Sequence, residues 1–173
     1  IITLLNSDMK KALLILSLLL ILCGCNITGR KKANLNDRYM NIIELIKEHE
    51  SFATSSNYYD INVEMAKITE GYRYYITIDN PRIAMYDIEL LAIEEDVDYM
   101  NNMAANVGIF EDTQYNMIPN QANAAKGFTK GIIASGISSK PETTLYIFTQ
   151  FKNQDFSKVH SEYFKLDVKY EAE

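Results

Sequence analysis

The sequence predicts a mainly β domain, an antiparallel sandwich preceded by one amphipathic helix and by an N-terminal signal helix. Between residues 58 and 170, about six short segments alternate apolar and polar side chains, which is the period of a half-buried strand. Turn-forming residues separate these segments, and the strand–helix alternation of a parallel sheet does not occur. Twelve Tyr and seven Phe also favour strands.

Residues 9–25 have the layout of a secretory signal. Lys10 and Lys11 precede the unbroken apolar run of residues 12–22, and small residues with cysteines follow it. A transmembrane helix needs roughly 20 apolar residues, so this run is short for one. An uncleaved anchor and a buried core helix are the alternatives, and side chains that are apolar on every side fit a core helix poorly.

The sequence Leu22-Cys23-Gly24-Cys25 resembles a bacterial lipobox. The resemblance implies cleavage before Cys25, diacylation of that cysteine (palmitate being one such lipid), and attachment to membrane lipid on the extracytoplasmic face of the cell membrane. Cys23 stands where the family more often has Ser, Ala or Thr. Because the chain opens on Ile1, we expect translation to begin at Met9, with residues 1–24 comprising an upstream extension and the signal peptide.

The composition of the remaining residues, 25–173, argues against several classes of partner and site. They have the usual size of one domain. The chain's 17 basic and 23 acidic residues fall to 15 and 22 once Lys10, Lys11 and Asp8 are removed, and this balance of −7 argues against a nucleic-acid partner. Both cysteines lie in the signal region, so the domain is expected to have no disulfide and no cysteine-based metal site.

Residues 25–34 are expected to form the lipidated cysteine and a polar tether, whose basic triplet could attract anionic headgroups. Residues 35–56 are expected to contain an amphipathic helix that packs on the domain, the alternative being a helix lying on the membrane. A mixed rather than basic polar face disfavours the membrane. The apolar face has spacings of three and four: Leu35, Tyr39, Ile42, Ile46 and His49.

Residues 57–173 are expected to form the sandwich. Strands are predicted around residues 61–65, 72–78 and 86–92, and their tight connections indicate that these neighbours pair antiparallel. Residues 96–125 lose the alternation and are predicted to be a long loop, within which residues 97–105 could form a short helix. Strand character resumes at 128–134, breaks at 136–141, and returns at 143–152 and 163–170.

The spacing of the strands between Tyr58 and Tyr170 resembles the immunoglobulin-like or fibronectin-III-like domains of bacterial surface lipoproteins. The resemblance is architectural, and it implies an antiparallel immunoglobulin-like β-sandwich. The chain departs from antibody domains because it lacks their paired cysteines and buried tryptophan.

No pattern of residues predicts catalysis or a cofactor. His49 and His160 lack metal-ligand spacing, Ser135 does not lie in a nucleophile elbow, and the glycines lack nucleotide-binding spacing. Four carboxylates at the start of the long loop could supply oxygen ligands for Ca²⁺, but they lack the glycine and distant glutamate of an EF-hand. A solvated acidic edge is the favoured interpretation of these carboxylates: Glu94, Glu95, Asp96 and Asp98.

Tyrosines are the strongest candidates for a binding surface, because an exposed aromatic ring combines apolar area with a hydrogen-bonding tip. The alternative is that a helix or second sheet covers them. The candidates are Tyr75, Tyr99, Tyr115 and Tyr146. We therefore expect a non-enzymatic binding or structural module of the bacterial envelope, whose partner is an envelope protein or surface ligand. A small-ligand carrier or transporter accessory is the second hypothesis, and an enzyme is the third.

Overall fold

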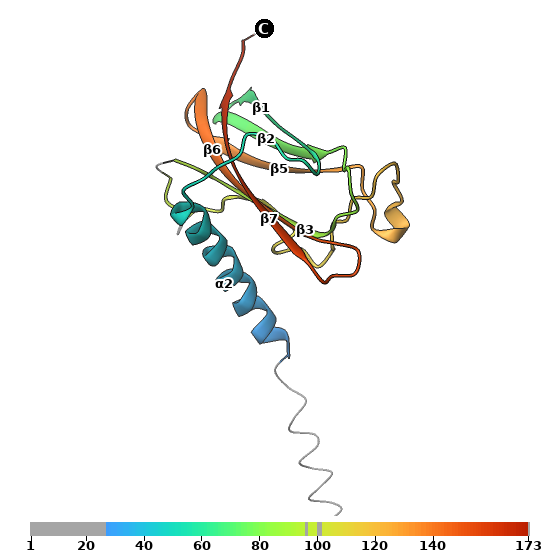
Figure 1. Ribbon diagram of the computed structural model, residues 1–173. Helices are drawn as coiled ribbons and strands as arrows, with labels where there is room; N and C mark the ends of the chain where they lie inside the picture. The colour runs from blue at the N-terminus through green and yellow to red at the C-terminus, as the bar shows by residue number, and fades with distance from the viewer. Residues whose placement is uncertain (1–26, 96, 100–101, 173) are drawn as a thin grey trace, which may run out of the picture. The chain divides into compact units, whose positions relative to one another are not determined.

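The computed structural model describes residues 27–95, 97–99 and 102–172 and is mainly β (Figure 1). The elements in chain order are α2 (Ile27–Glu48), β1 (Asp60–Ile68), β2 (Gly71–Asp79), β3 (Tyr86–Glu94), β4 (Ala105–Val107), the short 3₁₀ helix η1 (Ala124–Lys126), β5 (Gly131–Ser138), β6 (Glu142–Lys152) and β7 (Val159–Lys169). A compact unit that runs from Asp37 to Glu173 holds all of these strands. The predicted mainly β class is confirmed.

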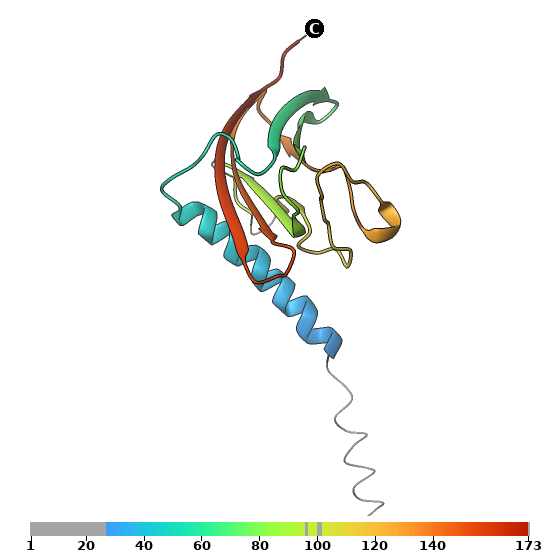
Figure 2. The same cartoon turned by 45° about the vertical axis from the view of Figure 1, so that its right-hand side comes forward.

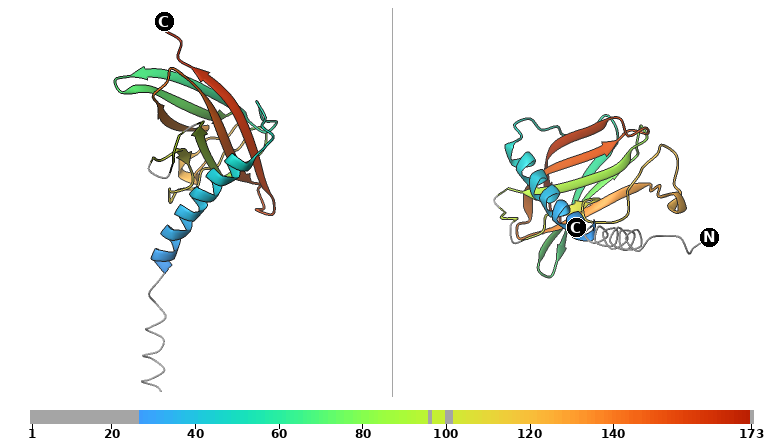
Figure 3. Two further views of the ribbon diagram at one scale, coloured as in Figure 1. Left: turned by 90° about the vertical axis from the view of Figure 1, so that its left-hand side faces the viewer. Right: turned by 90° about the horizontal axis from the view of Figure 1, so that it is seen from below.

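The strands form two antiparallel sheets. One has the order β1-β2-β5 and the other has the order β4-β3-β6-β7. The long β6–β7 hairpin pairs from Glu142↔Lys169 to Lys152↔Val159, and Figure 2 shows its two strands curving together. The β1–β2 hairpin can be followed at the top of the left view in Figure 3.

The expected pairing of three consecutive strands is confirmed for β1 with β2 and is wrong for β2 with β3. β3 pairs with β4 and β6 in the other sheet. The connection after β2 turns sharply at Asn80, which has a φ of 47°, and continues into Pro81, which has no amide hydrogen to donate. Strand periodicity identifies each strand but carries no information on which sheet it joins.

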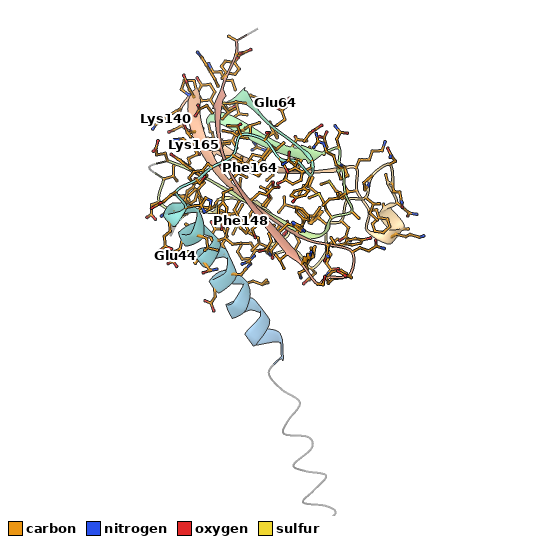
Figure 4. All side chains as sticks on the ribbon, viewed as in Figure 1. Glu44, Glu64, Lys140, Phe148, Phe164 and Lys165 are labelled. Carbon is orange, nitrogen blue, oxygen red and sulfur yellow. The ribbon has the colours of Figure 1, made fainter. Side chains whose placement is uncertain are left out.

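The first core lies between the two sheets. It contains Tyr74, Ile76 and Ile78 from β2, which alternate with more exposed residues as the sequence predicts. Phe164 and Ile147 come from the four-stranded sheet, and both are fully buried (Phe164 is labelled in Figure 4).

The second core covers the other face of the four-stranded sheet. Ile42 and Ile46 of α2 pack there with Leu91 of β3 and Phe148 of β6 (Phe148 is labelled in Figure 4). β3 is therefore buried on both faces, which explains why its residues 90–93 are all apolar. The interpretation of this segment as a helix packed on the domain is confirmed.

The helix bounds differ from the prediction. α2 begins at Ile27, within the predicted tether, and ends at Glu48, within the segment 35–56 that is expected to contain it. Arg, Lys and Ala are good helix formers, so the polar composition of the predicted tether does not oppose a helix. No helix in the described part of the chain is both long and apolar enough to cross a membrane. The predicted signal helix and the lipobox residues lie outside the described residues.

The predicted loop 96–125 is partly ordered into sheet. β4 pairs with β3 through Leu90↔Val107, and Met117 bridges Met85 with both side chains fully buried. The suggested short helix is wrong, since the described residues of 97–105 contain none. β5 also starts later than predicted and continues through Gly136, because the Tyr74 ring occupies the space that a Cβ there would fill.

Candidate functional site

The candidate site is an open hollow of about 790 Å³ on the helix-covered side of the four-stranded sheet. We call it the aromatic hollow. The end of α2, the connection after it, the end of β3 and strands β6 and β7 all contribute to its wall. Its lining residues are Ile46, Lys47, His49, Glu50, Phe52, Thr54, Ile93, Glu94, Glu95, Val97, Tyr146 and Lys165.

Three rings line one side of the aromatic hollow, those of His49, Phe52 and Tyr146, and the Tyr163 ring packs against them. His49 stacks on Tyr163, with 3.7 Å between ring centroids and 15° between ring planes. Phe52 meets His49 edge-on at 5.3 Å and Tyr146 edge-on at 5.2 Å. Such edge-to-face and stacked pairs add about 0.5–1.5 kcal/mol each beyond the area they bury. The rings therefore hold one another in place before any ligand arrives.

Backbone hydrogen bonds fix the connection that carries Phe52 and Thr54. The amide of Ala53 donates to the carbonyl of Tyr163 at 2.9 Å, and the amide of Lys165 donates to the carbonyl of Ala53 at 3.1 Å. Ala53 thereby forms a parallel bridge at the free edge of β7. The wall of the aromatic hollow is attached to the sheet and is preformed.

Charges of both signs surround the rings. The ammonium of Lys165 lies 5.2 Å from the centroid of the Tyr146 ring, and the Tyr146 hydroxyl donates to Oε1 of Glu95 at 3.2 Å. The hydrogen bond with the Tyr146 hydroxyl raises the pKa of Lys165, so this ammonium stays charged at neutral pH. Lys47 and Glu50 add a further cation and anion. The aromatic hollow thus offers flat apolar area with polar groups of either sign.

The four predicted binding tyrosines are not brought together. Tyr146 lines the aromatic hollow, whereas Tyr75 is 37% exposed on the outer face of the three-stranded sheet. Tyr115 is half-buried against the core between the sheets. Tyr99 is only 6% exposed, so its predicted place on an exposed surface is wrong. It is buried because its hydroxyl accepts a hydrogen bond from the Glu94 amide and its ring packs in the second core.

Two neighbouring carboxylates of the acidic run, Glu94 and Glu95, have different environments. Glu94 is 8% exposed, and Oε2 of its carboxylate accepts hydrogen bonds from Ser138 Oγ at 2.7 Å and Thr143 Oγ1 at 3.1 Å. Glu95 is exposed and bonds instead to Tyr146. The interpretation of a solvated acidic edge is therefore wrong for Glu94, because hydroxyls from β5 and β6 replace its water.

The described carboxylates of this run do not form a recognisable metal centre. Asp98 is exposed, and Asp96 lies outside the described residues. Within the ranges that the structure describes, no three His, Cys, Asp or Glu side chains are grouped so that they could hold a metal ion.

Sequence reasoning missed three main contributors to the aromatic hollow: His49, Phe52 and Lys165. His49 and Phe52 are three residues apart at the end of the predicted apolar helix face, which is the one signal that could have linked them. Lys165 is more than a hundred residues away and reaches Tyr146 only because β6 pairs with β7 through Tyr146↔Lys165.

Comparisons with known proteins give no guide to this chain. No protein-family model matches it, and no match was found among the curated proteins or the solved structures. The function is therefore argued from the site and the sequence signals.

Proposed function

We propose that this chain is a membrane-anchored, extracytoplasmic lipoprotein of the bacterial envelope whose β-sandwich serves as a non-enzymatic binding module. Cys25 carries the lipid and attaches the chain to membrane lipid, and Leu22, Cys23 and Gly24 complete the lipobox. The basis for this part of the proposal is the sequence of the signal region.

The proposal includes an immunoglobulin-like type for the sandwich, and the strand order supports it. In a constant-type immunoglobulin domain, strands one, two, four and five share a sheet, and strands three, six and seven share the other. Here β1, β2 and β5 share one sheet, β3, β6 and β7 share the other, and β4 lies beside β3. Only the fourth strand departs from the constant-type order.

The aromatic hollow is the single observation that carries the binding function. Protein–protein interfaces are enriched in aromatic residues and surrounded by polar rims. The aromatic hollow has this composition, with Phe52 and Tyr146 as apolar anchors and Lys165 and Glu95 as charged groups beside them. Because Ala53 attaches its wall to β7, a partner would pay little free energy to order it.

A small-ligand carrier is the second candidate, and the volume of about 790 Å³ favours it because ligand pockets span about 300–1,000 Å³. A carrier usually encloses its ligand in a mainly apolar cavity. The aromatic hollow is open and carries four charged side chains besides Glu94, so we place a protein partner first.

The test is photo-crosslinking in the native envelope. A benzophenone amino acid replaces Thr54, which is exposed and lines the aromatic hollow; the control places it at Lys158, in the exposed β6–β7 turn. We expect a protein adduct from position 54 only, lost when Tyr146→Ala removes an anchor. Identical adducts from both positions, or an adduct from 54 that survives Tyr146→Ala, would contradict the protein-binding role.

A further inference from the structure

We propose that the free edge of β5 is a second binding site, at which an extended peptide that carries a carboxylate adds to the three-stranded sheet as a further strand. This inference rests on the strand pairing of β5 and on an arginine that forms no ion pair with the described residues, so it can be tested separately from the aromatic hollow.

The first observation is a strand edge that has no ladder partner among the described residues. β5 pairs with β2 on one side, and no other described segment pairs with it on the other side. Its sequence, Gly-Ile-Ile-Ala-Ser-Gly-Ile-Ser, contains neither a charge nor a proline. Natural proteins usually protect a sheet edge with one of these. β1, at the opposite edge of the same sheet, carries Asp60, Glu64 and Lys67.

The second observation is that β5 exposes apolar side chains on the outer face of the sheet. Ile133 is 61% exposed and Ile137 is 51% exposed. Tyr75 of β2 pairs with Ser135 and lies between the two isoleucines on the same face. An added strand would cover this face with its alternate side chains, which is how sheet extension normally gains specificity.

The third observation is a groove of about 670 Å³ along the second half of β5, which we call the β5 groove. Ser135, Gly136 and Ile137 line one side, and Met103, which is 72% exposed, contributes from the segment before β4. Gly136 has no side chain to screen its backbone, and the Tyr74 ring fills the space on its inner side. The surface is therefore hollowed beside the second half of β5, which is where an added strand would begin to pair.

The fourth observation is an arginine that has no ion-pair partner among the described residues. Arg73 lines the β5 groove, its Nε is buried without a hydrogen-bond partner, and it takes part in none of the ion pairs of the described residues. Glu94 and Glu95 also line the groove, but their carboxylates bond to Ser138, Thr143 and Tyr146. Glu70 and Lys140 contribute one exposed charge of each sign. A carboxylate on the partner would pair with the guanidinium of Arg73 where it lines the β5 groove.

Charge also decides against a second copy of this chain as the occupant. Lys130 and Lys140 flank β5, and both are exposed. Antiparallel pairing of two β5 strands would bring Lys130 of one copy close to Lys140 of the other, and parallel pairing would bring like lysines together. Like charges across a strand pair are destabilising, whereas a peptide carboxylate is attracted to the same cations.

The test uses the full chain and a fluorescein-labelled peptide of sequence Thr-Val-Asp-Val-Thr-Val, followed by fluorescence anisotropy. Two further peptides have the same sequence. One carries N-methyl groups on its odd-numbered residues, and the other carries them on its even-numbered residues. Only alternate amides of an added strand face the edge it joins, so we expect one methylated peptide to bind about tenfold or more weakly and the other to bind like the parent. Loss of saturable parent binding, or equal effects of both methylations, would overturn the proposal.

Two matched variants locate the site. Ile137→Lys places a charge at the β5 edge, and Ala66→Lys places the same charge on the same face of the sheet at the β1 edge, since Ala66 and Ile137 both pair with Arg73. We expect about tenfold weaker binding for Ile137→Lys and unchanged binding for Ala66→Lys. Equal weakening by both would overturn the assignment to β5. Self-association of the free chain that Ile137→Lys abolishes would assign the edge to a second copy instead.

Discussion

Tyr99 shows at the residue scale how one hydroxyl joins the end of β3 to the segment after it. The Tyr99 hydroxyl accepts a hydrogen bond from the Glu94 amide at 2.7 Å, while the Glu94 carboxylate accepts from Ser138 and Thr143. Burial, and secondarily the negative charge of Glu94, raises the pKa of Tyr99 from 10.0 to about 12. The end of β3 is therefore held on both its backbone and its side chain.

This shifted pKa predicts a loss of stability in alkaline solution. Above pH 10.0 the unfolded chain releases a Tyr99 proton that the folded chain keeps until about pH 12, so the free energy of unfolding falls across that window. Tyr59 and Tyr74, whose pKa values burial also raises, steepen the same fall. We expect Tyr99→Phe to reduce the slope by about 1.4 kcal/mol per pH unit, measured by urea unfolding at several pH values. A slope equal to that of the wild type would contradict the burial of the Tyr99 hydroxyl.

Residue type alone could not separate the binding tyrosines from the structural ones. The sequence makes Tyr146 and Tyr99 equal candidates for a binding surface, yet Tyr146 lines the aromatic hollow and Tyr99 is buried. The difference arises from distant partners: Tyr146 lies half-buried at the edge of the second core, beside Lys165 and Phe52, while the same core encloses Tyr99. The alternation of apolar and polar residues indicates on which face of its helix or strand a side chain lies. It does not indicate which other elements cover that face.

At the element scale, the C-terminal half of α2 serves as a third layer over the four-stranded sheet. Ile42, Ile43 and Ile46 are buried against Leu91 and Phe148, so this half of the helix closes the second core. Arg38 reaches from the same helix to Glu89 of β3, with Nη2 at 2.6 Å from Oε2. Apolar packing and one part-buried ion pair therefore join this half of α2 to the sheet.

This arrangement predicts a strong contrast between two helix substitutions. Ile42→Ala should lower the free energy of unfolding by about 2–5 kcal/mol, because it opens a cavity in a fully buried layer. Leu45→Ala, on the exposed side of the same helix, should change it by about 0.5 kcal/mol or less. Urea unfolding of both variants measures the difference. Similar small losses in both would mean that the helix does not pack on the sheet in solution.

The alternation of apolar and polar residues in the sequence predicted the long strands, but it did not predict the order of the strands in the sheets. β2, β3 and β6 were found because each has a long apolar side facing the core between the sheets. β4 was missed because three residues are too few to show a period, and it is held by pairing with β3 at Leu90↔Val107. The crossing of β3 into the other sheet depends on the turn at Asn80 and on tertiary pairing, neither of which a period reports.

At the scale of the whole molecule, both proposed binding sites meet at the end of β3. Glu94, Glu95 and Val97 line the aromatic hollow and also the β5 groove. Both sites carry charges of both signs, but aromatic rings pack against one another in the aromatic hollow, whereas the β5 groove follows a strand edge. An extended partner that follows β5 would therefore reach the aromatic hollow as well, and Tyr146→Ala and Ile137→Lys separate the contributions of the two sites.

In our proposal a lipid anchor determines where these surfaces act. In our proposal Cys25 carries the lipid, and Cys23, two residues earlier, is removed with the signal peptide. The two cysteines therefore provide a variant and a control that are chemically identical and differ only in position.

The most direct measurement is metabolic labelling with an alkyne analogue of palmitate, combined with membrane fractionation of cells that express the full chain. We predict labelled protein in the membrane fraction for the wild type and for Cys23→Ser, and neither label nor membrane association for Cys25→Ser. Label that persists in Cys25→Ser, or a wild type that carries none, would contradict the lipoprotein proposal.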